Sequence, residues 1–171
     1  MGDIYNILAW AGSTIYQKND IVTNGGYFYY ATVGHTSTAN FNNDLNSGLW
    51  QGTLTYNGVT KSYFGWSPSY GYNLDVKPLV KTIKFGDGYA VDQADGINNI
   101  LLKLNLSFNQ RDLAEYTAIL HFLHSRAGSE QFFFIPPQPY GVVKKFVCQD
   151  FHPKQDFYEN YSIDCVFEER V

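Results

Sequence analysis

Hydrophobic and polar residues alternate most clearly between Leu102 and Phe108, where every second residue is apolar. A period of two is typical of a strand with one buried face. The residue types predict further strands over 78–85, 88–91, 131–135, 142–149 and 158 to about 169. Glycines flank Asp87 and predict a tight turn after the strand that ends at Phe85. The second half of the chain is therefore expected to form an antiparallel sheet.

One helix is predicted between these strands, because the apolar period changes there. Asn109 is the expected N-cap, Asp112 lies near the positive end, and Gly128 is expected to end the helix. One helical face is expected to pack on the sheet, and its apolar residues are Leu113, Tyr116, Leu120, Leu123 and Ala127.

The first part of the chain predicts a short hairpin. A strand over 21–23 and a strand over 27–33 are joined by the turn-forming residues Asn24, Gly25 and Gly26. In the second strand aromatic side chains point to both faces, with Phe28 and Tyr30 on one side. A module this small is not expected to bury all of them, so some rings should be exposed.

The two parts of the chain differ in chemistry. Residues 1–64 hold only five charged side chains but twelve aromatic ones, and most of the charge follows residue 64. Asn57 and Gly58 predict a hairpin or connecting ribbon at the junction. We therefore expect two domains, 1–58 and 59–171. The predicted fold class is α+β and mainly β: a small all-β module followed by an antiparallel sandwich or barrel-like domain with one helix.

Composition narrows the possible functions. A net charge of −4 and a pI near 5.4 argue against a basic nucleic-acid-binding face. No apolar run is long enough for a membrane-spanning helix, and Met1 to Trp10 shows no signal-peptide pattern. Cys148 and Cys165 are too few for a disulfide framework and are expected to stay reduced. The protein is expected to be made in a cytoplasm.

No catalytic constellation and no cofactor site stands out, so an enzyme is not expected. His121 and His124 lie three apart on the predicted helix, and the two cysteines could complete a metal site with them. No close-spaced cysteine motif supports this, so hydrogen-bonded or solvent-facing histidines and buried cysteines are favoured over a metal.

Aromatic residues in the first module suggest a ligand platform, because sugar rings stack on Trp and Tyr. The candidate carbohydrate-binding residues are Trp10, Tyr27, Tyr29, Tyr30 and Trp50. The alternative is that Trp10, Tyr16 and Trp50 form the small core of a module with few aliphatic residues.

The first third of the chain resembles chitin-binding carbohydrate-binding modules. The resemblance rests on an Ala-Trp start, a closing Trp and the segments 16–22 and 26–31. Asn19 stands where that family usually has glycine, and the proline common before the last Trp is absent. The resemblance implies a small β fold and a possible sugar ligand.

The remainder resembles the minor tail protein M family of lambda-like, non-contractile phage tails. The resemblance rests on the segments Val80–Tyr89, Gly96–Asn99, Pro136–Gly141 and Phe167–Val171. It implies a fold like that of tail-tube proteins and a ring of about six copies at the tail tip of a virion, assembled in the host cytoplasm. The implied partners are the chain itself, the tail tube protein, the tip hub proteins and the tape measure protein, with a host surface glycan for the first module.

Three segments are the expected assembly surfaces, although each could equally be a fixed turn of the fold. Their residues are Phe85, Gly86, Asp87, Gly88, Tyr89, Gly96, Ile97, Asn98, Asn99, Pro136, Pro137, Tyr140 and Gly141. Closing a ring through head-to-tail contacts would also cover sheet edges that otherwise invite aggregation. The alternative function is a carbohydrate-binding adhesion protein with no ring role.

Overall fold

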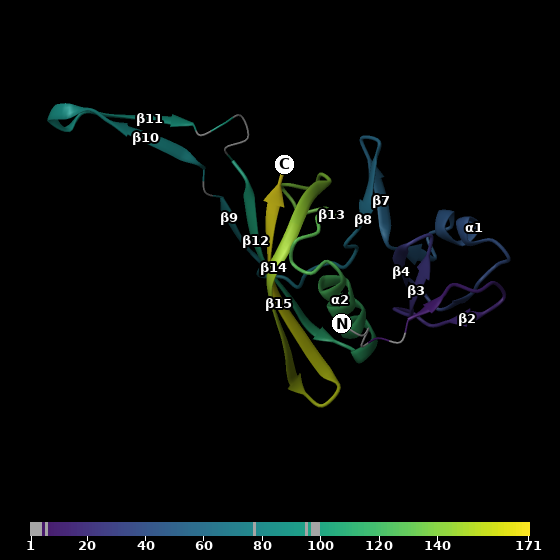
Figure 1. Ribbon diagram of the computed structural model, residues 1–171. Coiled ribbons are helices and arrows are strands. Elements are labelled where there is room, and N and C mark those ends of the chain that lie inside the picture. The colour runs from purple at the N-terminus through teal and green to yellow at the C-terminus, as the bar shows by residue number, and fades with distance from the viewer. Residues whose placement is uncertain (1–4, 6, 77, 95, 97–99) are drawn as a thin grey trace.

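The computed structural model describes residues 5, 7–76, 78–94, 96 and 100–171. The described chain is mainly β, with a small N-terminal module followed by a larger domain of antiparallel strands (Figure 1). Helix α2 lies between the five-stranded sheet of the larger domain and the N-terminal module. The predicted fold class, a small module followed by a β domain with one helix, is confirmed.

The N-terminal module contains a four-stranded sheet in the order β1-β3-β4-β6. The strands β3 and β4 form the predicted antiparallel hairpin, whereas β1 runs parallel to β3. A second ribbon pairs β2 with β5. The bounds are β1 Leu8–Ala9, β2 Ile15–Tyr16, β3 Ile21–Asn24, β4 Tyr27–Ala31, β5 His35–Thr36 and β6 Trp50–Gln51.

The module also has a short helix, which the sequence did not predict. Helix α1 spans Phe41–Asn46. Its N-cap is Asn40, whose side-chain oxygen accepts a hydrogen bond from the Asn42 N–H at 2.9 Å. Phe41 then packs its ring against Tyr29, with centroids 4.7 Å apart. Capping and this one buried ring fix a helix too short to show a period in the sequence.

The larger domain is built on a five-stranded sheet in the order β13-β14-β15-β12-β9. Strand β12 buries its apolar residues on one face, as the alternation predicted. Strand β14 runs past its predicted end at Gln149, because it pairs with β15 along nearly its whole length. The bounds are β9 Asn73–Val76, β12 Leu102–Arg111, β13 Phe132–Phe134, β14 Lys144–Phe157 and β15 Asn160–Arg170.

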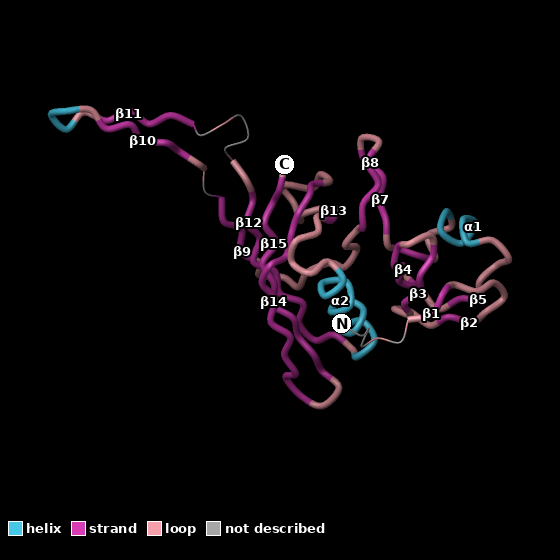
Figure 2. Tube along the Cα trace, viewed as in Figure 1, coloured by secondary structure: helices cyan, strands magenta, loops and turns pink. Residues whose placement is uncertain are grey.

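Three hairpins project from the body (Figure 2). One is the far end of β14 and β15. The second joins β7, Thr53–Tyr56, to β8, Val59–Ser62, through Asn57 and Gly58, whose φ angles are 50° and 75°. The Asn-Gly pair thus forms the predicted turn. The third joins β10, Val80–Lys84, to β11, Ala90–Ala94, through the short 3-10 turn η1, Gly86–Gly88.

Helix α2 spans Leu113–Ser125, so the predicted cap at Asn109 was wrong. Asp112 is the N-cap, and its carboxylate accepts a hydrogen bond from the Glu115 N–H at 2.8 Å. Asn109 instead belongs to β12. The buried face of α2 also differs from the predicted one, because the helix contacts the sheet on one side and the module on the other. The buried residues of α2 are Ala118, Ile119, His121, Phe122 and Leu123.

Strand β4 contributes side chains to two separate cores. Phe28 and Tyr30 pack with the core of the larger domain, and Tyr29 and Ala31 pack in the smaller core of the module. The Tyr30 hydroxyl also forms a buried hydrogen bond with Nδ1 of His121 in α2, at 3.0 Å. Burial raises the pKa of Tyr30 well above its ordinary value, so this hydroxyl stays neutral. The module is thereby packed firmly onto the larger domain.

We predict that Tyr30→Ala lowers the free energy of unfolding by about 3–5 kcal/mol, because it leaves a large cavity where the two cores meet. Tyr27→Ala is the matched control on the same strand. Its ring is 39% exposed, so we expect a loss of less than about 1 kcal/mol. Urea unfolding followed by tryptophan fluorescence measures both. Equal losses in the two variants would contradict the proposed role of Tyr30.

Candidate functional site

The predicted sugar-binding aromatics are mostly part of the core. Tyr29, Tyr30 and Trp50 are buried, and Trp10 is half-buried with its ring 5.5 Å from that of Phe41. The expectation that some rings stay exposed holds for Tyr27 at the start of β4, whereas the later residues of this strand are covered on both faces. Among the five candidates, Tyr27 alone is substantially exposed.

The alternative reading of these aromatics is confirmed. Tyr16 and Trp50 are buried in the small core, their ring centroids are 5.0 Å apart, and Trp10 packs against the same cluster. Sugar binding itself stays a prediction.

The Pro136–Gly141 loop is tied to the body of the larger domain. Pro136 is buried, and Tyr140 packs against the larger core. Tyr72 donates a hydrogen bond from its hydroxyl to the Gln138 carbonyl at 2.9 Å. Of this loop's predicted assembly residues, Pro137 and Tyr140 are partly exposed and Gly141 is exposed. Its use as an interface stays a prediction.

The second predicted assembly segment is described only at Gly96, which is exposed and has a φ of 86°. Ile97, Asn98 and Asn99 lie outside the described residues.

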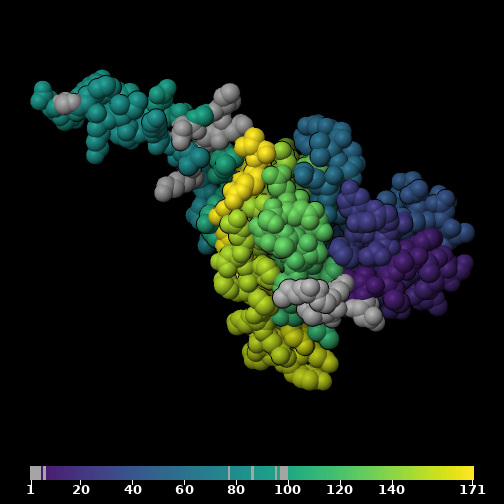
Figure 3. All heavy atoms as spheres, in the orientation of Figure 1, coloured from purple at the N-terminus to yellow at the C-terminus, as the bar shows by residue number. Residues whose placement is uncertain are grey.

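The third predicted segment, Phe85 to Tyr89, is the tip of the β10–β11 hairpin, which we call the arm. Every residue of the two strands is exposed. The arm stands apart from the rest of the chain as a narrow projection (Figure 3). At its tip the Phe85 N–H donates to the Tyr89 carbonyl at 2.7 Å, and Asp87 takes a left-handed φ of 64°.

The arm is amphipathic. Residues that pair across an antiparallel ribbon share a face, and the pairs Ile83 with Val91 and Lys84 with Ala90 therefore lie on opposite faces. Phe85 and Tyr89 continue the face of Ile83, with ring centroids 5.9 Å apart. Four exposed hydrophobic residues thus form one apolar face of the arm: Ile83, Phe85, Tyr89 and Val91.

An isolated two-stranded hairpin is at best marginally stable in water. Among the described residues, nothing covers either face of the arm. The arm would therefore gain stability from contact with another molecule. The sequence showed its turn but not its isolation, because exposure of both faces is a tertiary property.

Sequence reasoning also missed a groove on the larger domain. The groove has a volume of about 1020 Å³ and is lined by parts of the segments 63–72, 109–111 and 134–137. Its first segment is rich in aromatic, glycine and serine residues, and this composition was the available signal. The sequence did not predict the groove, because its lining comes from three segments that are distant in sequence.

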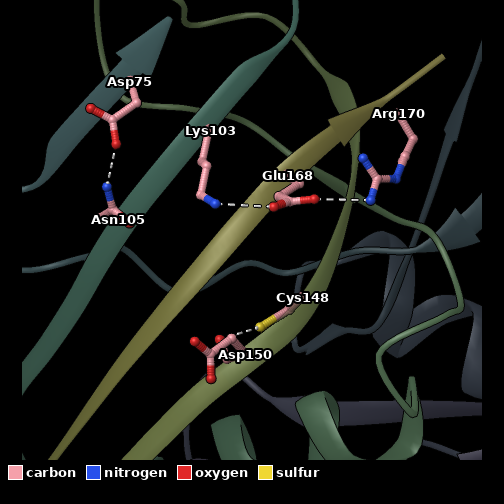
Figure 4. A network of polar contacts seen from close by, with 7 residues as sticks. All are labelled: Asp75, Lys103, Asn105, Cys148, Asp150, Glu168 and Arg170. Atoms are coloured by element: carbon pink, nitrogen blue, oxygen red, sulfur yellow. Dashed lines mark hydrogen bonds and ion pairs between the residues drawn. The ribbon is translucent and has the colours of Figure 1, made fainter. Parts of the chain in front are cut away.

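The outer face of the five-stranded sheet carries a polar network (Figure 4). Glu168 accepts from Lys103 at 3.2 Å and from Arg170 at 2.9 Å, and Asn105 donates to Asp75 at 2.9 Å. The hydrogen bond from Lys103, with the contact from Arg170, lowers the pKa of Glu168. This face is polar in the single chain and needs no apolar partner.

The histidines and cysteines have structural surroundings. Cys148 and Cys165 are buried and not disulfide-bonded. The pKa of Cys165 is raised, mainly by its hydrogen bond with Cys148 and then by its burial. His121 lies buried beside Tyr30, and Nδ1 of His124 is 3.1 Å from the Tyr5 hydroxyl. Within the described residues, no three His, Cys, Asp or Glu side chains lie together as a metal site would require. Nor does either helix there have the length and apolarity to cross a membrane.

An uncovered hairpin with an apolar face favours contact with another molecule, as expected of a subunit that assembles with others. Comparison with known families agrees with this class. Residues 62–171 match the phage minor tail protein family, and this chain belongs to that family. It is thus a protein of a phage tail.

Residues 9–51 are similar to carbohydrate-binding module family 5/12. No curated protein sequence matches the chain. Among solved structures, a chain in the tail of an empty GTA particle with C6 symmetry is similar at 12% identity and a TM-score of 0.38, over 70% of this chain and 89% of that chain.

We predict that Glu168→Gln lowers the free energy of unfolding at pH 7 by less than about 1 kcal/mol, since the ion pairs are partly exposed. The pKa of Glu168 is lowered in the folded state, so its contribution is complete above the unfolded pKa of about 4.3. The difference between the two proteins should disappear as pH falls through the lowered folded pKa. Urea unfolding between pH 3 and pH 7 measures it. Asp87→Asn on the exposed arm is the control, and a difference that grows at acid pH would contradict the assignment.

Proposed function

We propose that this protein is a structural component of a non-contractile phage tail tip, where about six copies form a ring that joins the distal end of the tail tube to the tip hub. The observation that carries the proposal is the exposed amphipathic arm on a chain of the phage minor tail protein family. The role is structural rather than enzymatic.

The physical support for a ring is the asymmetry of the subunit. The arm projects on one side of the sheet, and the N-terminal module packs against α2 on the other side (Figure 1). Two unlike surfaces on opposite sides of a subunit can pair head to tail, and such contacts close into a ring when the rotation between copies permits it. The neighbours of the ring are then the tail tube protein, the hub proteins and the tape measure protein.

A reconstruction of the assembled tail by electron microscopy tests this proposal. We expect this chain to form a closed ring directly below the tail tube. In tails assembled with the double variant Phe85→Ser and Tyr89→Ser the ring should be absent, because the arm loses its apolar tip. Thr82→Ser, on the other face of the arm, is the matched control and should leave the ring intact. Finding the chain elsewhere in the tail, or as isolated copies, would refute the proposal.

The match of residues 9–51 to a carbohydrate-binding module family favours a second role, in which the module binds a glycan on the host surface. Burial of the other candidate rings leaves Tyr27, at 39% exposure, as the candidate aromatic residue best placed for stacking.

We predict that Tyr27→Ala reduces binding of the full chain to a glycan array at least tenfold without changing its unfolding curve. Tyr56→Ala is the matched control, because Tyr56 is similarly exposed but lies on β7, outside the matched module. If only Tyr56→Ala lost glycan binding, the binding site would lie outside the matched module. If the unaltered chain binds no glycan, the second role is wrong and the structural role is unaffected.

A further inference from the structure

The arm and the groove of the larger domain are two uncovered surfaces of the same chain. The arm points away from the body, so it does not fill the groove of its own chain (Figure 1). In a head-to-tail ring each copy uses two different surfaces once. The question is therefore whether these two surfaces complement each other.

The groove offers aromatic and apolar contacts. Tyr70 is fully exposed at its edge, Ile135 is 41% exposed, and Tyr63 and Tyr72 are half-buried. The tip of the arm presents two exposed rings, Phe85 and Tyr89, next to each other. Aromatic pairs of this kind gain from edge-to-face contacts beyond the burial of their area.

The groove also offers donors and positive charge. Arg111 is the charged residue among those that line it, and the lining includes no acidic side chain; Nη1 of Arg111 also pairs with Glu115, which lies outside the lining, at 2.7 Å. Trp66 lines the groove with only 6% of its surface exposed, and neither its Nε1–H nor the Nε–H of Arg111 has a hydrogen-bond partner among the described residues. Both donors are enclosed in the single chain, so an acceptor that enters the groove would satisfy them only with a small shift of the lining.

The arm brings such an acceptor at its tip. Asp87 lies between the two aromatic residues, exposed, at the outermost turn of the hairpin. Its carboxylate accepts hydrogen bonds and carries the charge opposite to that of Arg111. The groove and the arm tip therefore match in both apolar surface and charge.

The arm is also long enough to reach beyond its own body. Each strand of the arm has five residues, which extend roughly 17 Å at the usual rise of a strand. That length carries the tip clear of its own body (Figure 1).

We infer that the arm of one copy docks its tip, Phe85 to Tyr89, into the groove of the next copy, and that this contact links the subunits of the ring. Ile83 and Val91 continue the apolar contact along the groove, and Asp87 faces Arg111 and Trp66. The inference rests on the proposed ring and adds the pair of surfaces that forms it.

Two defective variants and their mixture test the inference with the full chain. The arm variant carries Phe85→Ser and Tyr89→Ser, and the groove variant carries Tyr70→Asp and Ile135→Asp. All four side chains are exposed, so both variants should fold normally. Native mass spectrometry of each variant alone should show monomers, whereas the unaltered chain forms closed rings. A one-to-one mixture should form a dimer and nothing larger, because only one intact arm and one intact groove can meet.

Tyr158→Asp is the matched control, since Tyr158 is an equally exposed aromatic at the tip of the β14–β15 hairpin. The Tyr158→Asp variant should assemble into closed rings as the unaltered chain does. Rings that persist in the groove variant, or a mixture that stays monomeric while the unaltered chain forms rings, would overturn the inference but leave the ring in place. An unaltered chain that stays monomeric at every concentration would instead contradict the proposed function.

Discussion

The docking of strand β4 between two cores is the contact on which the rest of this structure depends. A strand sends alternate side chains to opposite faces, so Phe28 and Tyr30 can enter the larger core while Tyr29 and Ala31 fill the smaller one. Tyr30 adds a buried hydrogen bond to His121 of α2. The helix is thus held from both sides, by the sheet and by the module, and the two parts of the chain behave as one body. The same docking covers aromatic rings that a free module would expose, so residues proposed for sugar binding serve instead to attach the module.

The arm is the opposite case, because neither of its faces is covered within the chain. Its apolar face is an energetic cost in the monomer and a source of stability in an assembly. Head-to-tail contact with a further copy removes that cost without exposing any surface of the body. The polar outer face of the five-stranded sheet, where Glu168 bridges Lys103 and Arg170, has no such requirement. In the proposed ring the arm therefore directs assembly, and the polar face of the sheet can face solvent or the interior of the ring.

The sequence predicted those features that depend on local pattern. The period of two gave β12, and the Asn57–Gly58 pair gave the β7–β8 turn. The N-cap of α2 was misplaced, because Asn109 and Asp112 have equally suitable side chains and only the extent of β12 decides between them. Exposure was predicted least well. Whether Tyr30 is a ligand platform or a core residue depends on a helix more than eighty residues away, and local pattern does not record that contact. The tip of the arm was found by its turn residues, whereas the groove was missed because it joins three distant segments.

In the proposed ring, the rigid body of each copy leaves the arm as the part that adjusts to a neighbouring copy. The module and the larger domain share cores, so the body has little freedom to adapt its shape to a neighbour. The adjustment between subunits must then occur in the arm, whose two strands pair only with each other. Neither core contains a residue of the arm, so in the proposed ring a change in the angle of the arm would disturb neither core. Stability and assembly are thereby assigned to different parts of the chain, and a substitution at the tip of the arm should affect the second without affecting the first.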